Sequence, residues 1–171
     1  MPTSRYLIAL GSNQRHLRFG NPSNVLKHAL AAMTAKGIAV QFKSPVMHSR
    51  PLGPSQRTYA NSAAIIETKI WPSQLLMVLK KIERDFGKRR GQTWSRRTLD
   101  LDIILWSEGV FSSGFPKLTI PHHASANDIF VLAPAGTIAA HWRDPISGLS
   151  IAQLAWRLNH PKPLDRKAMD H

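Results

Sequence analysis

The chain has 171 residues, of which 43% are hydrophobic and 19% are charged, an ordinary balance for one globular domain. It contains no cysteine, which excludes disulfides and thiolate metal sites. No apolar run approaches the roughly 18 residues of a membrane span, and residues 1–10 lack the apolar length of a signal peptide. We therefore expect a single cytoplasmic domain over residues 1–171, a monomer with no membrane partner.

The formal net charge of +13 predicts an anionic partner: nucleic acid, a membrane surface or the phosphates of a small substrate. The charge is concentrated in residues 80–97, where eight lysines and arginines are accompanied by only two acids, Glu83 and Asp85. A solvated basic face is the alternative explanation of this segment. Charge alone therefore leaves the kind of partner open.

The first part of the chain predicts a strand, a helix and a second strand. Residues 6–10 form a short apolar run. Asn21 and Pro22 are a cap and a first-turn signal for a helix, whose apolar residues recur at helical spacing until Gly37. Residues 38–49 predict a strand that is interrupted by a proline.

The next part predicts a strand, a helix and a strand. Residues 59–70 are rich in β-branched residues in their second half. Pro72 opens a second helix, which ends at Gly87 and carries one apolar stripe. The stripe consists of Leu75, Leu79, Ile82 and Phe86. With a strand at residues 99–106, the order of elements predicts an α+β fold, a ferredoxin-like split βαβ sandwich.

Beyond this core the sequence predicts an added C-terminal hairpin and helices. We expect a glycine and serine turn near residues 112–114, and helices over residues 128–139 and 150–158. No internal repeat, low-complexity tract or linker divides the chain.

Two aspartates in the last of these strands are the main candidates for chemistry. Side chains alternate along a strand, so Asp100 and Asp102 point to one face while the apolar residues beside them point to the other. Adjacent carboxylates repel each other, and Mg²⁺, which binds one or two carboxylates together with substrate phosphates, would offset this repulsion. The alternatives are a solvent-facing pair on an edge strand, or ion pairs with the neighbouring arginines.

A longer pattern around the two aspartates carries a family resemblance. Residues 97–104, Arg-Thr-Leu-Asp-Leu-Asp-Ile-Ile, resemble the signature of the hydroxymethyldihydropterin pyrophosphokinases. Further segments resemble the same family in the same order: residues 7–13, 51–54, 59–63, 118–122 and 130–134. Each short match is weak, but their ordered combination over residues 6–158 is specific.

The resemblance implies a reaction of folate biosynthesis. The hydroxymethyl oxygen of 6-hydroxymethyl-7,8-dihydropterin attacks the β-phosphorus of ATP, a pyrophosphoryl group is transferred and AMP leaves. Asp100 and Asp102 would hold two Mg²⁺ ions that bridge the ATP phosphates and the pterin hydroxyl. Arg97 would contact phosphate as a further catalytic residue, and Lys88 and Arg90 would close over the triphosphate, with Arg90 also catalytic.

The resemblance also implies which residues contact each substrate. Those for ATP are Glu83, Lys88, Arg90, Arg97, Ile103, Lys117, Thr119 and His122. Those for the pterin are Ser49, Arg50, Leu52, Tyr59, Asn61, Trp94 and Phe130. Trp94 and Phe130 would stack on the ring, and Asn61 would pair with its polar edge. Glu83 has an alternative as an exposed helix acid that pairs with a neighbouring lysine.

Three features depart from the family pattern. Ser95 and Arg96 stand where relatives usually have Gly-Pro. The loop after Gly87 is slightly shorter than in some members, which leaves open which of its basic residues (88–90) act in the lid. Asp128 stands where an arginine is common, and we expect its side chain to point away from the triphosphate or to pair with a lid residue such as Arg90.

Two other functions stay open at this point. A ferredoxin-like sheet is shared with RNA-recognition domains, and the basic charge suits phosphate contacts, although the aromatic sheet motif of those domains is absent. A second alternative is a nucleotide-binding pseudoenzyme of the same fold, because Asp128 stands where an arginine is common. We favour the enzyme, with ATP and the pterin as small-molecule partners and no specific nucleic-acid partner.

Overall fold

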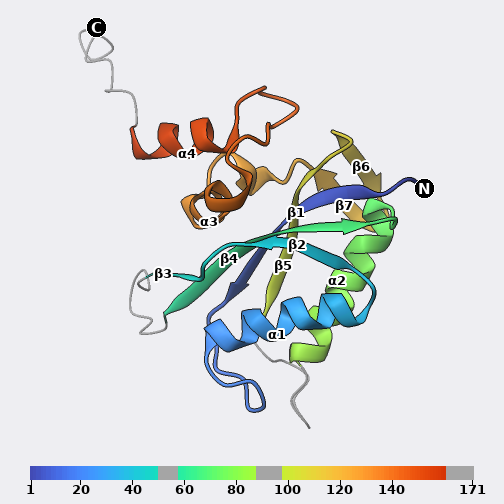
Figure 1. Ribbon diagram of the computed structural model, residues 1–171, viewed down its shortest axis with the longest axis vertical. Helices are drawn as coiled ribbons and strands as arrows, with labels where there is room; N and C mark the ends of the chain where they lie inside the picture. Colours follow the sequence, from blue (N-terminus) through green and yellow to red (C-terminus); the bar gives the residue numbers. More distant parts are fainter. Residues whose placement is uncertain (50–57, 88–97, 161–171) are drawn as a thin grey trace, which may run out of the picture.

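The computed structural model describes residues 1–49, 58–87 and 98–160, which build one antiparallel sheet with helices around it (Figure 1). The strands lie in the order β2-β4-β1-β5, and β3 also pairs with β4. Their bounds are β1 Ser4–Ser12, β2 Ala39–Lys43, β3 Met47–Ser49, β4 Tyr59–Thr68 and β5 Asp100–Trp106. The predicted strands are confirmed, including the interruption that separates β2 from β3.

Helices cover both faces of the sheet (Figure 1). Their bounds are α1 Pro22–Ala35, α2 Pro72–Gly87, α3 Ile129–Ala139 and α4 Ile151–Asn159. Tyr6, Ile8 and Leu10 of β1 are buried in one core with α1 and α2. The alternate residues Leu7 and Ala9 are buried in a second core with α3 and α4. The ferredoxin-like α+β arrangement predicted from the order of elements is therefore confirmed.

The helices of the first layer follow their predicted signals. The Asn21 side chain accepts the Asn24 N–H at 3.0 Å and caps α1, with Pro22 in the first turn. Gly37 follows the helix at φ +79°, a conformation that glycine adopts with little strain. The α2 stripe is buried as expected: Leu75, Leu79, Ile82 and Phe86.

The turn predicted near residues 112–114 is present but lies slightly later, at residues 115–116. Residues 112–114 themselves belong to β6 (Phe111–Gly114), which pairs with β7 (Lys117–Ile120). The exposure of β6 alternates, with Phe111 packed against the core and Ser112 exposed, and this period of two indicates a strand despite the serines. The hairpin itself and the helices α3 and α4 are confirmed, and within the described ranges no helix is long and apolar enough to cross a membrane.

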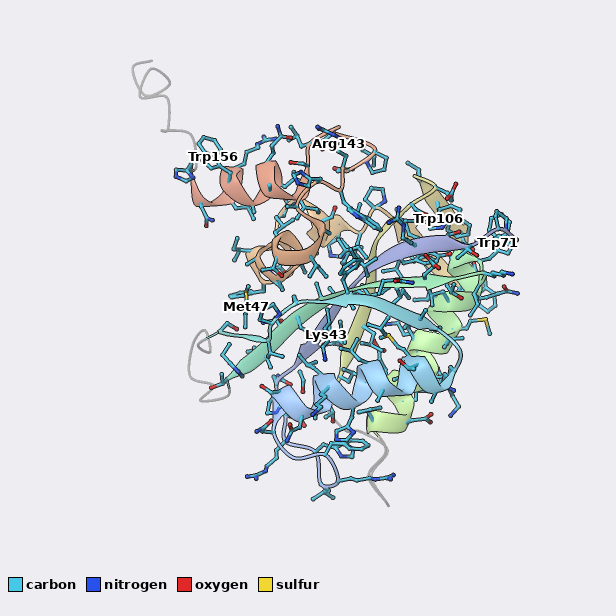
Figure 2. The ribbon with its side chains drawn as sticks, viewed as in Figure 1. Lys43, Met47, Trp71, Trp106, Arg143 and Trp156 are labelled. Atoms are coloured by element: carbon cyan, nitrogen blue, oxygen red, sulfur yellow. The ribbon has the colours of Figure 1, made fainter. Side chains whose placement is uncertain are left out.

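Aromatic rings fill the end of the sheet where β1 begins and β5 ends. The Trp106 ring lies 6.1 Å from those of Tyr6 and Trp71, measured between centroids, and Figure 2 shows the two tryptophans together at this end. Tyr6 is fully buried and donates its hydroxyl to the Ile70 carbonyl at 2.7 Å. Large side chains thus close one end of β1, whereas small residues follow at the other end.

Replacing a buried residue of the α2 stripe should cost far more than replacing an exposed one on the same helix. Leu79→Ala removes a fully buried side chain and should lower the free energy of unfolding by about 2–5 kcal/mol. Met77 is 62% exposed, so Met77→Ala should change it by less than about 0.5 kcal/mol. Urea unfolding of both variants measures the difference, and equal effects would contradict the described packing of α2.

Candidate active site

A pocket of about 380 Å³ lies where β1 ends and where β4 and β5 begin. Gly11 of β1 pairs with Asn61 of β4 on one side and with Asp100 of β5 on the other. Paired residues of neighbouring strands point to the same face, so the Asn61 and Asp100 side chains flank Gly11. Asp102 lies opposite Ala9 in the same way. The small residues of β1 therefore leave space between larger polar groups.

The pocket is acidic although the chain is basic. Asp100, Asp102 and Asp128 line it, which is three of the ten acids in the whole chain. Its other lining residues within the described ranges carry no charge: Ala9, Leu10, Gly11, Ser12, Asn13, Ser49, Tyr59, Asn61, Phe130 and Val131. Like charges gathered in one wall raise the local negative potential, which favours the binding of a cation.

Asp100 and Asp102 have the donor chemistry of a magnesium site. Both carboxylates lie on the pocket face of β5, with Asp100 exposed and Asp102 partly exposed. In the part of the chain that the structure describes, no group of three or more His, Cys, Asp or Glu is placed to hold an ion. Mg²⁺ binds through one or two carboxylates and takes its remaining oxygens from water and substrate phosphates. Two carboxylates on one face fit an ion that arrives with such a substrate.

His122 lies beside this pair, directly after β7. Its Nδ1 accepts the Ala124 N–H at 3.1 Å, and its Nε2 lies 3.9 Å from Oδ1 of Asp102. Burial lowers the pKa of His122, an effect that the nearby Asp102 carboxylate opposes. The neutral ring with Nδ1 as acceptor carries its proton on Nε2. His122 therefore presents an N–H donor toward Asp102.

Glu83 of α2 reaches the same strand from the other side. Its Oε1 accepts the Leu101 N–H at 2.7 Å, and Lys80 donates to the same carboxylate at 2.9 Å. The Glu83 side chain is only 10% exposed. The lysine pairing that we gave as an alternative is present. The exposure that the same alternative predicted is wrong, because the Glu83 carboxylate is turned toward β5 and bonded to it. The predicted contact of Glu83 with ATP stays a prediction.

The predicted pterin residues that the structure describes gather at one end of the pocket. Ser49, Tyr59, Asn61 and Phe130 all line it, and the two aromatic rings are each 42% exposed. A neighbouring hollow of about 200 Å³ shares Ser49, Asn61 and Phe130 and is bounded by Met47 of β3, which Figure 2 labels. Exposed aromatic rings beside an amide are suited to a flat polar heterocycle.

Other predicted residues lie elsewhere. Six fall outside the described residues: Arg50, Leu52, Lys88, Arg90, Trp94 and Arg97. Ile103 is buried in the core on the opposite face of β5, so its side chain does not line the pocket and only its main chain is left for a nucleotide contact. Lys117 and Thr119 share the exposed face of β7 and are not among the lining residues.

Asp128 has a role that the sequence analysis missed. It is the N-cap of α3, and its Oδ1 accepts the Phe130 N–H at 2.9 Å. Asp128 also lines the pocket. Its orientation relative to a triphosphate and its pairing with Arg90, which lies outside the described residues, stay predictions. An aspartate directly before a predicted helix is a capping signal, so the sequence did contain the information. The cap holds Phe130 at the edge of the pocket.

The chain is similar to one family of enzymes over most of its length. A model of the 7,8-dihydro-6-hydroxymethylpterin-pyrophosphokinase family matches residues 7–140. A 2-amino-4-hydroxy-6-hydroxymethyldihydropteridine pyrophosphokinase of Synechocystis sp. is 36% identical over 149 residues, which cover 86% of this chain and 73% of the relative. The enzyme of the same name from Haemophilus influenzae is 38% identical over 135 residues, covering 78% and 80%.

Larger proteins contain a similar unit. A mitochondrial folate synthesis bifunctional protein of Arabidopsis thaliana is 40% identical over 129 residues, which are 75% of this chain and 22% of that protein. The crystal structure of a Plasmodium falciparum HPPK-DHPS triple mutant with pteroate matches with a TM-score of 0.67 at 10% identity. It covers 91% of this chain, which spans 43% of that one. This structural likeness supports the fold.

Removing the Asp128 cap should destabilise α3, whereas changing only its charge should not. Asp128→Ala deletes the acceptor of the Phe130 N–H and should lower the free energy of unfolding by about 1 kcal/mol. Asp128→Asn keeps an acceptor and should stay within about 0.5 kcal/mol of the wild type. Urea unfolding tests both, with the α4 cap variant Ser150→Ala as a reference remote from the pocket. Equal stability of the Ala and Asn variants would show that the cap contributes nothing.

Proposed function

Because the chain belongs to the 7,8-dihydro-6-hydroxymethylpterin-pyrophosphokinase family, it is an ATP-dependent pyrophosphokinase of folate biosynthesis, and we propose that the pocket between β1, β4, β5 and α3 is its active site. The observation that carries this placement is the register of β1. It sets Asn61, Gly11 and Asp100 in one row, with Asp102 beside them over Ala9. A polar edge for a heterocycle and a pair of carboxylates for a metal thus face the same space.

Asp100 and Asp102 would hold Mg²⁺, and we propose two ions because the ATP phosphates and the pterin hydroxyl would meet at one carboxylate pair. Bound magnesium neutralises charge on the transferred group and helps to orient it. Their position on a strand that is paired to β1 keeps both carboxylates on the pocket face. The acidity of the pocket repels a free triphosphate, so these residues also make nucleotide binding depend on the metal.

The pterin would occupy the end of the pocket that Tyr59, Asn61 and Phe130 line. Asn61 offers both a donor and an acceptor to the polar edge of the ring. Phe130 supplies a face for stacking, and the Asp128 cap fixes the helix turn that carries it. In this pose the hydroxymethyl group points toward Asp100, which lies across Gly11 from Asn61.

The nucleotide would lie on the His122 side of the two aspartates. The Nε2–H of neutral His122 is a donor for a phosphate or ribose oxygen, because Nδ1 already accepts the Ala124 N–H and the ring proton is therefore on Nε2. Lys117, Thr119 and the main chain of Ile103 are the further candidates among the described residues, with Lys88, Arg90 and Arg97 proposed for the triphosphate. The pterin hydroxyl oxygen then attacks the β-phosphorus, the bond to the α-phosphate oxygen breaks and AMP leaves.

Small molecules account for the basic charge better than nucleic acid does. Three carboxylates belong to the wall of the pocket, and they would repel a phosphate backbone that lay against it. We propose a cytoplasmic monomer that takes ATP and the pterin and has no specific nucleic-acid partner.

Loss of either metal carboxylate should abolish most turnover without unfolding the protein. We expect Asp100→Asn and Asp102→Asn each to lower the rate of AMP formation at least about a hundredfold, which corresponds to roughly 2.7 kcal/mol of transition-state stabilisation. Circular dichroism should be unchanged because one of two like charges is removed. The control is Glu108→Gln, which removes an acid from the turn after the same strand. Near-normal AMP formation by either aspartate variant would refute the metal assignment.

Magnesium should control the binding of both substrates. With excess EDTA, a non-hydrolysable ATP analogue should bind at least about tenfold more weakly than with Mg²⁺, since the pocket carboxylates then repel the triphosphate directly. Pterin should bind more tightly once the analogue and Mg²⁺ are present, because the metal and phosphates complete its site. Isothermal titration measures both effects, and identical pterin affinity with and without the analogue would contradict the proposed arrangement.

A further inference from the structure

β5 carries the two aspartates and lies at the edge of the sheet. In the described part of the chain it follows β1 as the last strand of the order, and it begins at Asp100. Alternate N–H groups of an edge strand point away from the sheet and need another acceptor. The Leu101 N–H is such a group, and it sits between Asp100 and Asp102. The first residues of an edge strand are held by few ladder bonds, so the position of these aspartates depends on what binds this edge.

Glu83 binds the edge at this one point. Its Oε1 accepts the Leu101 N–H at 2.7 Å, a short distance expected for a charged acceptor. Lys80, one turn earlier on α2, donates to both oxygens of the same carboxylate at 2.9 and 3.1 Å. The pair sits on a helix whose position is fixed by its buried stripe, in which Leu79 and Ile82 are neighbours of Lys80 and Glu83.

We propose that Glu83, braced by Lys80, is a positioning residue that orients the Asp100 and Asp102 carboxylates through the Leu101 amide. The inference rests on the proposed metal role of the two aspartates. The amide that Glu83 holds joins Asp100 to Leu101, and the next amide joins Leu101 to Asp102, so a rotation of this segment tilts both carboxylates. Glu83 acts on both aspartates through the main chain, by its bond to the Leu101 N–H.

The geometry distinguishes this role from direct nucleotide contact. Oε1 is shared by Leu101 and Lys80, Oε2 is bonded to Lys80, and the side chain is 10% exposed. Little of the carboxylate is left for a ligand. Lys80, by contrast, is 36% exposed, and its charge contributes to the lowered pKa of His122 after the larger effect of burial. The Lys80 and Glu83 pair therefore links α2 to the side of the site where His122 lies.

The test uses variants of the full chain and two readouts besides activity. Glu83→Ala removes the acceptor, Glu83→Gln keeps one, and Lys80→Met removes the brace. Asp85→Asn is the matched control, since Asp85 is an α2 acid that pairs with Lys81 and is 41% exposed. The readouts are hydrogen exchange of the Leu101 amide in the metal-free protein and the apparent Mg²⁺ affinity with a non-hydrolysable ATP analogue.

We expect Glu83→Ala to accelerate Leu101 exchange and to weaken Mg²⁺ binding, each at least about tenfold, because one charged hydrogen bond is lost. Glu83→Gln should stay within about threefold of the wild type on both readouts, with Lys80→Met between the two. Affinity for the analogue in EDTA should change less than about twofold in every variant, since Glu83 is not a nucleotide ligand in this account. Asp85→Asn should match the wild type throughout.

Two results would overturn the proposal. One is Leu101 exchange and Mg²⁺ affinity in Glu83→Ala that match those of Asp85→Asn. The other is an equal loss of analogue affinity with and without Mg²⁺, which would make Glu83 a direct ligand. If Glu83→Ala does not fold, the test uses Lys80→Met. Unchanged hydrogen exchange of the Leu101 amide in that variant would then refute the proposal that Lys80 supports Glu83. Failure of the proposed function looks different: Asp102→Asn would then leave Mg²⁺ affinity unchanged, while Leu101 exchange still reports on Glu83.

Discussion

The pairing of β1 with β4 and β5 is the constraint on which the site depends. Side chains alternate faces along a strand, so a slip of one residue in the pairing of β1 with β5 would move Asp100 and Asp102 from the pocket face into the core of α1 and α2. The same slip in the pairing of β1 with β4 would move Asn61 away from the pocket. The alternation of β1 prevents such a slip, because its large residues Tyr6, Ile8 and Leu10 fill that core. The residues between them on the other face include Ala9 and Gly11, which are small enough to leave a pocket. Burial of the large residues on one face of β1 thus fixes which residues line the pocket on its other face.

Sequence periodicity predicted those features of the fold and the site that depend only on residues close together in the chain. The element order, the α2 stripe and the common face of Asp100 and Asp102 follow from periods of 3.6 and 2 that each residue satisfies within its own segment. The turn near residues 112–114 was predicted slightly too early because serine and glycine favour turns by composition, whereas the pairing of these residues with β7 depends on a strand that comes later. The Asp128 cap was missed although an aspartate directly before a predicted helix is a capping signal.

Contacts between distant segments were beyond the sequence for a different reason. Glu83 and Leu101 are 18 residues apart, and their bond exists only because α2 docks against β5 with one particular rotation. The sequence indicated two possible roles for Glu83: pairing with Lys80 on the helix surface, or a contact beside the apolar stripe. Which role applies depends on how α2 docks against β5. The structure combines them, since Lys80 donates to the nearly buried carboxylate while the bond from the Leu101 N–H holds the strand.

The charge distribution completes the physical argument for a metal-dependent reaction. The net charge of +13 attracts a triphosphate at long range, but salt screens exposed charges beyond about 8 Å under physiological conditions. Near the pocket the described wall is negative, with three aspartates and uncharged neighbours. A polyanion drawn to the protein therefore meets a local barrier at the described wall, and cations that bind between it and the carboxylates lower that barrier. In the function that we propose, this opposition between a basic molecule and an acidic pocket wall would make the divalent ion part of substrate recognition.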